Sequence, residues 1–137
     1  MNKISWKDEY CVGVEKIDRQ HQHLFELINM LIERPASYDD TKLISEMLKE
    51  MFNYAREHFS TEETYMSTYD FPGYFPHKSQ HDYFIKTAIE LGEDFMNNKS
   101  VTVDEITEFL VIWLKNHILK TDMKFKPFFA AKIPAGA

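Results

Sequence analysis

The side chains of this sequence best suited to chemistry are its six histidines. Five of them fall at helical spacing among apolar residues, namely His21, His58, His77, His81 and His117. The sixth, His23, lies two residues from His21, about 200° around a helix, and is expected to face solvent. Imidazole is a common ligand of transition metals. The spacing therefore predicts helices that each turn at least one such ligand toward a shared interior.

Two pairs of these residues have the spacing of metal ligands on one helix. His58 and Glu62 are four residues apart, as are His77 and His81, so the members of each pair lie about 40° apart, one turn along. A single buried histidine is more often a hydrogen-bonded core residue, and one such pair is a weak signal. The whole set is stronger, because burying five imidazoles and a carboxylate without a shared partner costs several kcal/mol. A bound cation removes that cost.

The kind of metal follows in part from the donors. Five imidazoles and a carboxylate are more than a tetrahedral zinc site takes, and calcium and magnesium prefer oxygen ligands. Nitrogen and oxygen donors in excess of one ion's needs favour two ions of iron or manganese. The residues alone thus predict a dinuclear transition-metal site.

The elements that must position these ligands are helical. Four segments have the period of amphipathic helices, namely residues 18–34, 40–66, 76–98 and a fourth that opens at Thr102 with a capping-box pattern. Pro35 ends the first, and the loop Tyr69–Gly73 breaks the second. Short links between four such helices predict an all-α fold, an antiparallel up-down-up-down four-helix bundle in a single domain over residues 1–137. A non-helical N-terminal arm is expected over Ile4–Ile17, and the aromatic tail Phe125–Phe129 is expected to pack against the bundle end.

Composition excludes several classes of partner. The net charge is −6, which disfavours binding to nucleic acid and to anionic membranes. The longest purely apolar run, Phe109–Leu114, is far too short for a membrane span, and the first residues are too charged for a signal peptide. The single Cys11 is compatible with a reducing compartment. We therefore expect a cytoplasmic protein, and a monomer.

The ligand candidates fall in motifs that resemble those of a known family. The motifs are Gly13-Val14, Ile17-Asp18-Arg19-Gln20-His21, His58-Phe59-Ser60-Thr61-Glu62-Glu63, His77-Lys78-Ser79-Gln80-His81, and Trp113-Leu114-Lys115-Asn116-His117 followed by Asp122. In this order they resemble the bacterial hemerythrins, from about Trp6 to Phe128. The resemblance implies reversible binding of dioxygen at a non-haem centre of two iron ions.

The resemblance also implies the role of each ligand. His77, His81 and His117 would bind one iron, and His21 and His58 the other. Glu62 and Asp122 would bridge the two ions together with an oxo or hydroxo group. One position would stay open on the His21/His58 iron, where dioxygen would bind. An apolar oxygen pocket is suggested at Trp113, Leu114, Ile118, Leu24 and Phe25, for which plain core packing is the alternative.

Asp122 is the ligand that periodicity does not find. It follows His117 by five residues, about 140° away on an ideal α-helix. For Asp122 to reach the same face, the helix must widen or end, as a π-bulge allows.

Other functions remain as alternatives to an oxygen carrier, store or scavenger. Ferritin-like di-iron bundles that react with oxygen use mostly carboxylates, whereas the balance here is five histidines to two carboxylates, which favours a protein that is not an enzyme. A sensor, an oxidase, or a protein that binds nitric oxide or azide-like anions at the same site is the alternative. Tyr54, Tyr65 and Tyr83 are redox candidates, although packing or surface roles are favoured for them. The aromatic loop from Tyr69 to Phe75 is either a docking patch or, as we favour, packed back on the bundle.

Overall fold

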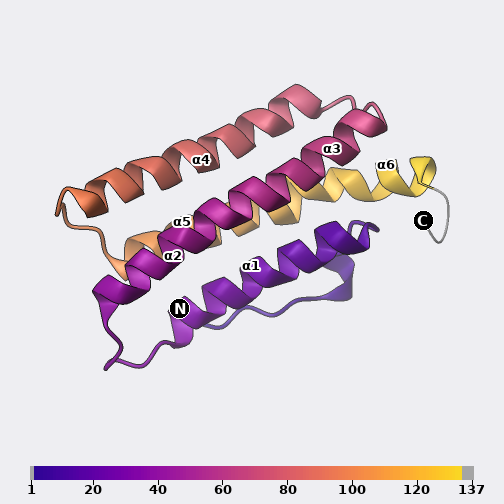
Figure 1. Cartoon of the computed structure of the whole chain (residues 1–137). Coiled ribbons are helices and arrows are strands. Elements are labelled where there is room, and N and C mark those ends of the chain that lie inside the picture. The colour runs from indigo at the N-terminus through magenta and orange to yellow at the C-terminus, as the bar shows by residue number, and fades with distance from the viewer. Residues whose placement is uncertain (1, 134–137) are drawn as a thin grey trace.

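Four helical columns form the molecule, and the computed structural model describes residues 2–133 of the chain. The first column is α1 (Glu15–Glu33), and the third is α4 (Tyr74–Met96). The second column joins α2 (Asp40–Tyr54), the π-helix η2 (Ala55–Phe59) and α3 (Ser60–Thr68), and the fourth joins α5 (Val103–Trp113), the π-helix η3 (Leu114–Thr121), the 3₁₀ turn η4 (Asp122–Lys124) and α6 (Phe125–Lys132). The columns lie side by side and alternate in direction (Figure 1). No strand occurs within residues 2–133.

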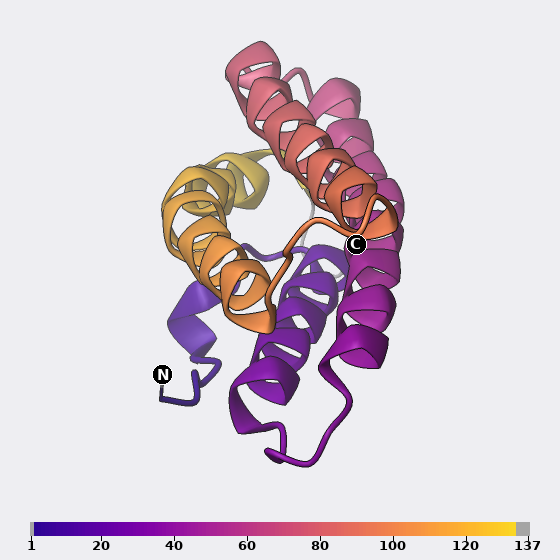
Figure 2. The ribbon, with the colours of Figure 1, turned by 90° about the vertical axis from the view of Figure 1, so that its left-hand side faces the viewer.

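The order of the columns in space is that of the chain. Seen from the end opposite α6, the columns surround a common axis (Figure 2). Helix α1 packs against α2 and α5, and α2 packs against α4. The predicted all-α bundle is confirmed. No helix among the described residues has the length and apolar character to cross a membrane.

Local chemistry explains where the helices begin and end. The side chain of Asp39 accepts a hydrogen bond from the Lys42 amide at the start of α2. At α5 the Thr102 hydroxyl accepts from the Glu105 amide while the Glu105 carboxylate accepts from the Thr102 amide, which is the predicted capping box. Helix α1 stops just before Pro35, which cannot continue a helix.

The N-terminal arm differs from the prediction. It was expected to be non-helical over Ile4–Ile17, but Asp8–Tyr10 form a 3₁₀ turn and α1 already begins at Glu15. Gly13 takes a positive φ of 92°, which lets the chain turn sharply into the helix. The Asp18 carboxylate then accepts a bond from the Val12 amide and fixes that turn. The arm runs back along α1 (Figure 1), where the Ile4 amide bonds to Asn29.

Two apolar clusters fill the bundle. The large cluster contains most of the buried side chains of α1, α2 and α5, for example Leu31, Met47 and Leu110. The small cluster joins the arm, α3 and α6 through Val12, Val14, Ile17, Met66, Phe125 and Phe129. The first, second and fourth columns each pass from one cluster to the other within about two turns. The buried histidines and acids lie between the two clusters. The tail Phe125–Phe129 packs on the bundle as predicted, although it does so as a helix.

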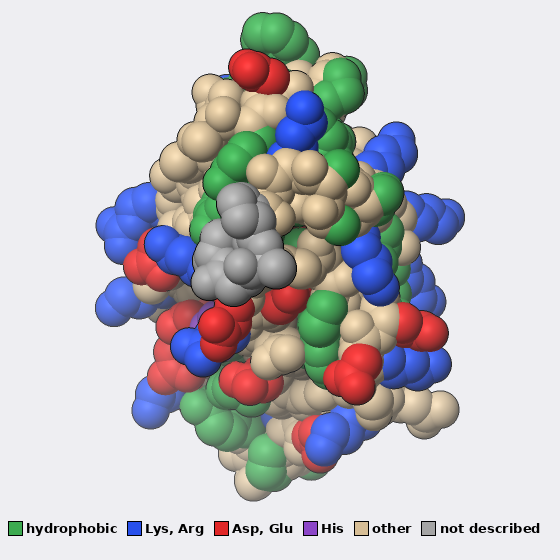
Figure 3. Space-filling model, turned by 90° about the vertical axis from the view of Figure 1, so that its right-hand side faces the viewer, with side chains coloured by type: hydrophobic (Ala, Val, Ile, Leu, Met, Phe, Trp, Pro, Cys, Tyr) green, Lys and Arg blue, Asp and Glu red, His purple; other side chains and the backbone are tan. Residues whose placement is uncertain are grey.

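The aromatic loop after α3 packs mainly inward. Phe71 lies edge-on to Phe125 and Phe128, with ring centroids 5.1 and 5.0 Å apart, and Tyr69 contacts Phe129. Phe75 is the exception, at 79% exposed. On the face that shows this end of the bundle, hydrophobic side chains are interspersed with charged ones (Figure 3).

Candidate metal centre

A layer of polar side chains crosses the bundle between the two apolar clusters. All of its members are at most 2% exposed: His21, His58, Glu62, His77, His81, His117 and Asp122. These are the seven ligand candidates of the sequence, and the fold brings all seven together. His23, expected to face solvent, is exposed.

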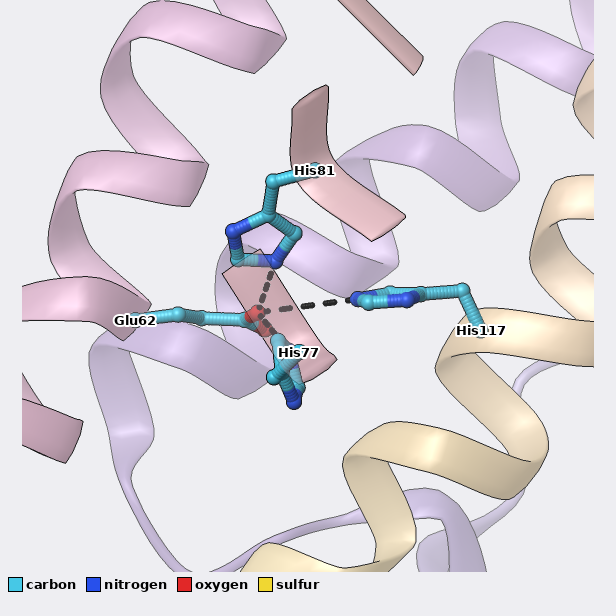
Figure 4. A group of neighbouring side chains, drawn as sticks. All are labelled: Glu62, His77, His81 and His117. Carbon is cyan, nitrogen blue, oxygen red and sulfur yellow. Dashed lines mark hydrogen bonds and ion pairs between the residues drawn. The ribbon is translucent and has the colours of Figure 1, made fainter. Parts of the chain in front are cut away.

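Glu62 stands at the middle of the layer. Its Oε1 lies 3.1 Å from Nε2 of His77 and 2.9 Å from Nε2 of His81, with Nε2 of His117 at 3.8 Å. Figure 4 shows these three imidazoles converging on the carboxylate from α4 and η3. The other oxygen, Oε2, lies 3.0 Å from Nε2 of His21 and 2.8 Å from Nε2 of His58. One carboxylate therefore divides the imidazoles into a group of three and a group of two.

Asp122 also turns one oxygen to each group. Its Oδ1 lies 3.0 Å from Nε2 of His77 and 3.1 Å from Nε2 of His117, whereas Oδ2 lies 3.0 Å from Nε2 of His21. Both acids thus turn one oxygen to each group. Two sets of donor atoms result, each with all its atoms within 4.8 Å of one another: Glu62, His77, His81 and His117, and His21, His58, Glu62 and Asp122.

Several buried atoms in this layer lack hydrogen bonds. Nε2 of His58, Nε2 of His117 and both oxygens of Asp122 have no partner in hydrogen-bonding geometry, although oppositely charged groups stand close. Buried polar atoms left in this way cost about 1–3 kcal/mol each. A cation in each set would satisfy them, and mixed imidazole and carboxylate donors suit iron. The residues present fit a pair of metal ions.

The charges of the layer favour cations. Burial alone would raise the pKa of Glu62, but the imidazoles, His58 first, hold that pKa well below its usual value. Burial would likewise raise the pKa of Asp122, yet His117 and His21 help to hold it below the ordinary range. Both carboxylates are therefore ionised, and they draw positive charge into the core.

The imidazoles respond to these carboxylates. Burial disfavours the protonated form of His21, but the nearby carboxylate of Asp122 and the hydrogen bond to Glu62 outweigh it and raise its pKa to about 10. The same balance raises the pKa of His77 to about 9 and also raises that of His117. For His58 burial prevails, and its pKa is lowered. Metal ions would replace these protons as the source of positive charge.

Two π-helical segments position the candidate ligands. The predicted widening before Asp122 is present, because η3 covers Leu114–Thr121 and Asp122 follows it. The wider turn brings a residue five positions after His117 to the same face. A second π-segment, η2, contains His58 and was not predicted. Four-residue spacing to Glu62 gave no sign of it.

Sequence reasoning missed the side chains that hold the outer ring nitrogens. Nδ1 of three imidazoles lies at hydrogen-bond distance from a side-chain oxygen: His58 from Gln20 at 2.7 Å, His117 from Gln80 at 2.7 Å, and His81 from Glu63 at 2.8 Å. Such partners fix the rotation of a ligand ring. Each of the three adjoins a ligand in the sequence, about 100° around the helix, where it can reach the next column. That adjacency was the available signal.

Aromatic rings cover four of the imidazoles. Phe59 stacks on His81 with ring centroids 4.0 Å apart, and Trp113 stacks on His117 at 4.1 Å. Tyr54 and Phe125 lie nearly parallel to His58 and His77 at 4.9 and 4.7 Å.

The suggested oxygen-pocket residues lie in the core. Leu24, Phe25, Trp113, Leu114 and Ile118 are all buried in the large cluster. Trp113 stacks on the His117 imidazole, and the role of the set as an oxygen pocket stays a prediction. Among the redox candidates, Tyr54 is buried with its hydroxyl 3.3 Å from Nε1 of Trp113, and burial raises its pKa well above the ordinary value. Tyr83 is exposed.

Comparison with known proteins gives a consistent assignment. Residues 12–129 match the family described as the hemerythrin HHE cation binding domain. The chain is 34% identical to a bacteriohemerythrin of Clostridium acetobutylicum over 88% of this chain and 96% of that one, and 34% identical to a hemerythrin-like protein of Naegleria gruberi over 90% and 91%. It also resembles the crystal structure of a wild-type hemerythrin, with a TM-score of 0.79 and 28% identity over 92% of this chain and 97% of that one.

Proposed function

This chain belongs to the hemerythrin family, whose members generally bind oxygen at a non-haem di-iron centre, and we propose that it is a reversible carrier, store or scavenger of dioxygen. The observation that carries the proposal is the way two carboxylates divide five buried imidazoles. Both Glu62 and Asp122 turn one oxygen to a group of three and the other to a group of two. Such an arrangement suits two neighbouring ions rather than one.

We assign the ligands accordingly. His77, His81 and His117 would hold one iron, His21 and His58 the other, and Glu62 and Asp122 both. When bound, the two irons supply a two-electron couple that binds dioxygen reversibly. The group of two offers one imidazole fewer, so it is the side on which the protein leaves room for an exogenous ligand.

The surrounding residues would keep the whole centre dry. The ligands are at most 2% exposed, and Leu24, Phe25 and Leu114 lie in the large apolar cluster. Excluding water from a site suppresses side reactions such as proton leakage to a bound ligand. Aromatic rings stacked on His81 and His117 add to this apolar surround. These features support reversible binding over turnover, as does the ratio of five imidazoles to two carboxylates.

Further parts of the proposal concern the protein as a whole. We propose one domain over residues 1–137 that acts as a cytoplasmic monomer, with nitric oxide and azide-like anions as competing ligands. The net charge of −6 supports the absence of nucleic acid as a partner.

The test is an anaerobic spectroscopic titration. The protein is loaded with ferrous iron, its iron content is measured, and visible spectra are recorded before air, after air and after purging. We expect two irons per chain and a band that appears with oxygen and fades on purging. Oxidation without a reversible adduct would overturn the carrier proposal in favour of an oxidase, and His58→Gln should abolish the band whereas His23→Gln, at an exposed histidine, should not.

A further inference from the structure

The acceptors that hold the outer nitrogens of the site imidazoles are of two chemical kinds. His58 and His117 each face a glutamine amide oxygen, whereas His81 faces a carboxylate oxygen of Glu63 at 2.8 Å. A ring nitrogen that binds a metal carries no proton, and in these rings Nε2 points inward. The proton therefore sits on Nδ1, which donates it to the acceptor.

The two kinds of acceptor act differently on the ring. A hydrogen bond to an ionised carboxylate is roughly twice as strong as one to a neutral amide. It draws the proton away from Nδ1 and makes the opposite nitrogen a stronger electron donor. His81 is thus the strongest donor of the three imidazoles with such partners.

We propose that Glu63 is a positioning residue that, through His81, biases the iron of the three-imidazole group toward the ferric state. This inference rests on the proposed function, because it assigns a role within the same centre. Glu63 itself contacts no ion.

The fold places this third acid where its charge costs little. Glu63 follows Glu62 on α3 and so turns about 100° away from the core, toward α4. Its side chain is 24% exposed, whereas that of His81 is fully buried. It lines a groove of about 530 Å³ that Lys78 and Asp82 also line. The Glu63 carboxylate opens onto this groove, so a negative charge acts on a buried ring without being fully buried itself.

No carboxylate among the described residues accepts a hydrogen bond from an outer ring nitrogen of the two-imidazole group. His58 bonds to the amide of Gln20, and Nδ1 of His21 has no hydrogen-bond partner. Among the described residues, the two groups therefore differ in the acceptors that bond to their outer ring nitrogens as well as in the number of imidazoles. The two-imidazole group, which would leave room for dioxygen, is also the group whose outer ring nitrogens have no carboxylate acceptor.

The experiment compares two isosteric changes of opposite sign. Glu63→Gln replaces the carboxylate by an amide, and Gln80→Glu does the reverse at His117. Each is measured for the midpoint potential of the iron-loaded protein and for affinity toward Co²⁺. We expect Glu63→Gln to raise the potential and weaken Co²⁺ binding by about 10–100-fold, as loss of an outer partner does. Gln80→Glu should lower the potential and tighten binding.

The matched control is Asp82→Asn. It removes one negative charge from the same groove, but the Asp82 carboxylate pairs with Lys78 at 3.2 Å rather than with an imidazole. We expect it to leave both readouts near the wild type. An equal shift in Asp82→Asn, or no shift in Glu63→Gln, would overturn the inference.

The outcomes separate this inference from the proposed function. If the unchanged protein binds two irons and oxygen reversibly while Glu63→Gln has the wild-type potential, only the role of Glu63 is wrong. If the unchanged protein binds fewer than two metals, the proposed function fails first. Should Glu63→Gln not fold, a Gln80→Glu protein with an unshifted potential would still contradict the inference.

Discussion

Along the fourth column, the core around Leu110 and the core seven residues further on, around His117, are built differently. Leu110 lies on the regular helix α5 among the apolar side chains of the large cluster. His117 lies on the π-helix η3, in a layer of imidazoles and carboxylates. Both positions are at most 1% exposed. The two regions are therefore equally buried, but different interactions must stabilise them.

The large cluster is stabilised mainly by burial, at about 25 cal/mol for each Å² of apolar surface removed from water. Burial cannot stabilise the site layer in this way, because buried polar atoms without partners oppose folding. We infer that bound metal stabilises this layer and that the π-segments aim its ligands. The predictions below separate the two regions.

The largest effect is expected from Glu62→Gln. Among the described residues, Glu62 is the one acid that approaches all five imidazoles, so its loss should abolish metal binding in both groups. Loss of a residue that only hydrogen-bonds to a ligand lowers metal affinity by up to about 100-fold. The affinity of Glu62→Gln for metal should fall further than that. Metal per chain after dialysis is the measurement, and Glu108→Gln, at an exposed acid of α5, is the control. Full metal content in Glu62→Gln would show that Glu62 is not a ligand.

Removal of the metal should affect the two regions unequally. At metal concentrations about 1,000 times Kd, each ion adds about 4 kcal/mol to the free energy of unfolding, and a chelator should remove this. Amide hydrogen exchange should then rise in Ala55–Phe59 and Leu114–Thr121 before it rises around Met47. An equal rise in amide hydrogen exchange in both regions would contradict the view that metal stabilises the site layer and not the large cluster.

A cavity in the large cluster should lower stability without changing metal binding. Leu110→Ala should lower the free energy of unfolding by about 2–5 kcal/mol, because Leu110 is fully buried. Chemical denaturation with and without metal should give the same difference, and the metal content should stay at the wild-type value. A change in metal content would mean that the regions are coupled.

The smallest effect is expected at a helix end of the apolar region. Thr102→Ala removes the hydroxyl that caps α5 and should cost about 0.5–2 kcal/mol, with no change in metal content. Thr41→Ala, at an exposed position of α2, is the matched control and should cost less. Thermal unfolding of both variants is the measurement, and an equal loss of stability in Thr41→Ala would contradict the capping role of Thr102.

Much of this division could be predicted from the sequence. Apolar period, Pro35 and the capping box gave the helices, because burial and capping are local rules. The same period placed His21, His58, His77, His81 and His117 on core faces, and all five are buried there. Asp122 needed the family resemblance, since five-residue spacing contradicts an ideal helix.

The missed features share a physical cause. Gln20, Glu63 and Gln80 are polar residues on the flanks of helices, where a sequence predicts solvent, and only the neighbouring column supplies their partners. Tyr54 was counted with packing or surface tyrosines, and its contact with His58 depends on tertiary structure. The π-segment at His58 leaves no trace in the spacing to Glu62.

The most direct test is a crystal structure of the iron-loaded protein with anomalous scattering recorded at the iron edge. We predict two anomalous peaks per chain, one beside His77, His81 and His117 and one beside His21 and His58, with Glu62 and Asp122 contacting both. A single peak, or iron bound outside this layer, would contradict the account.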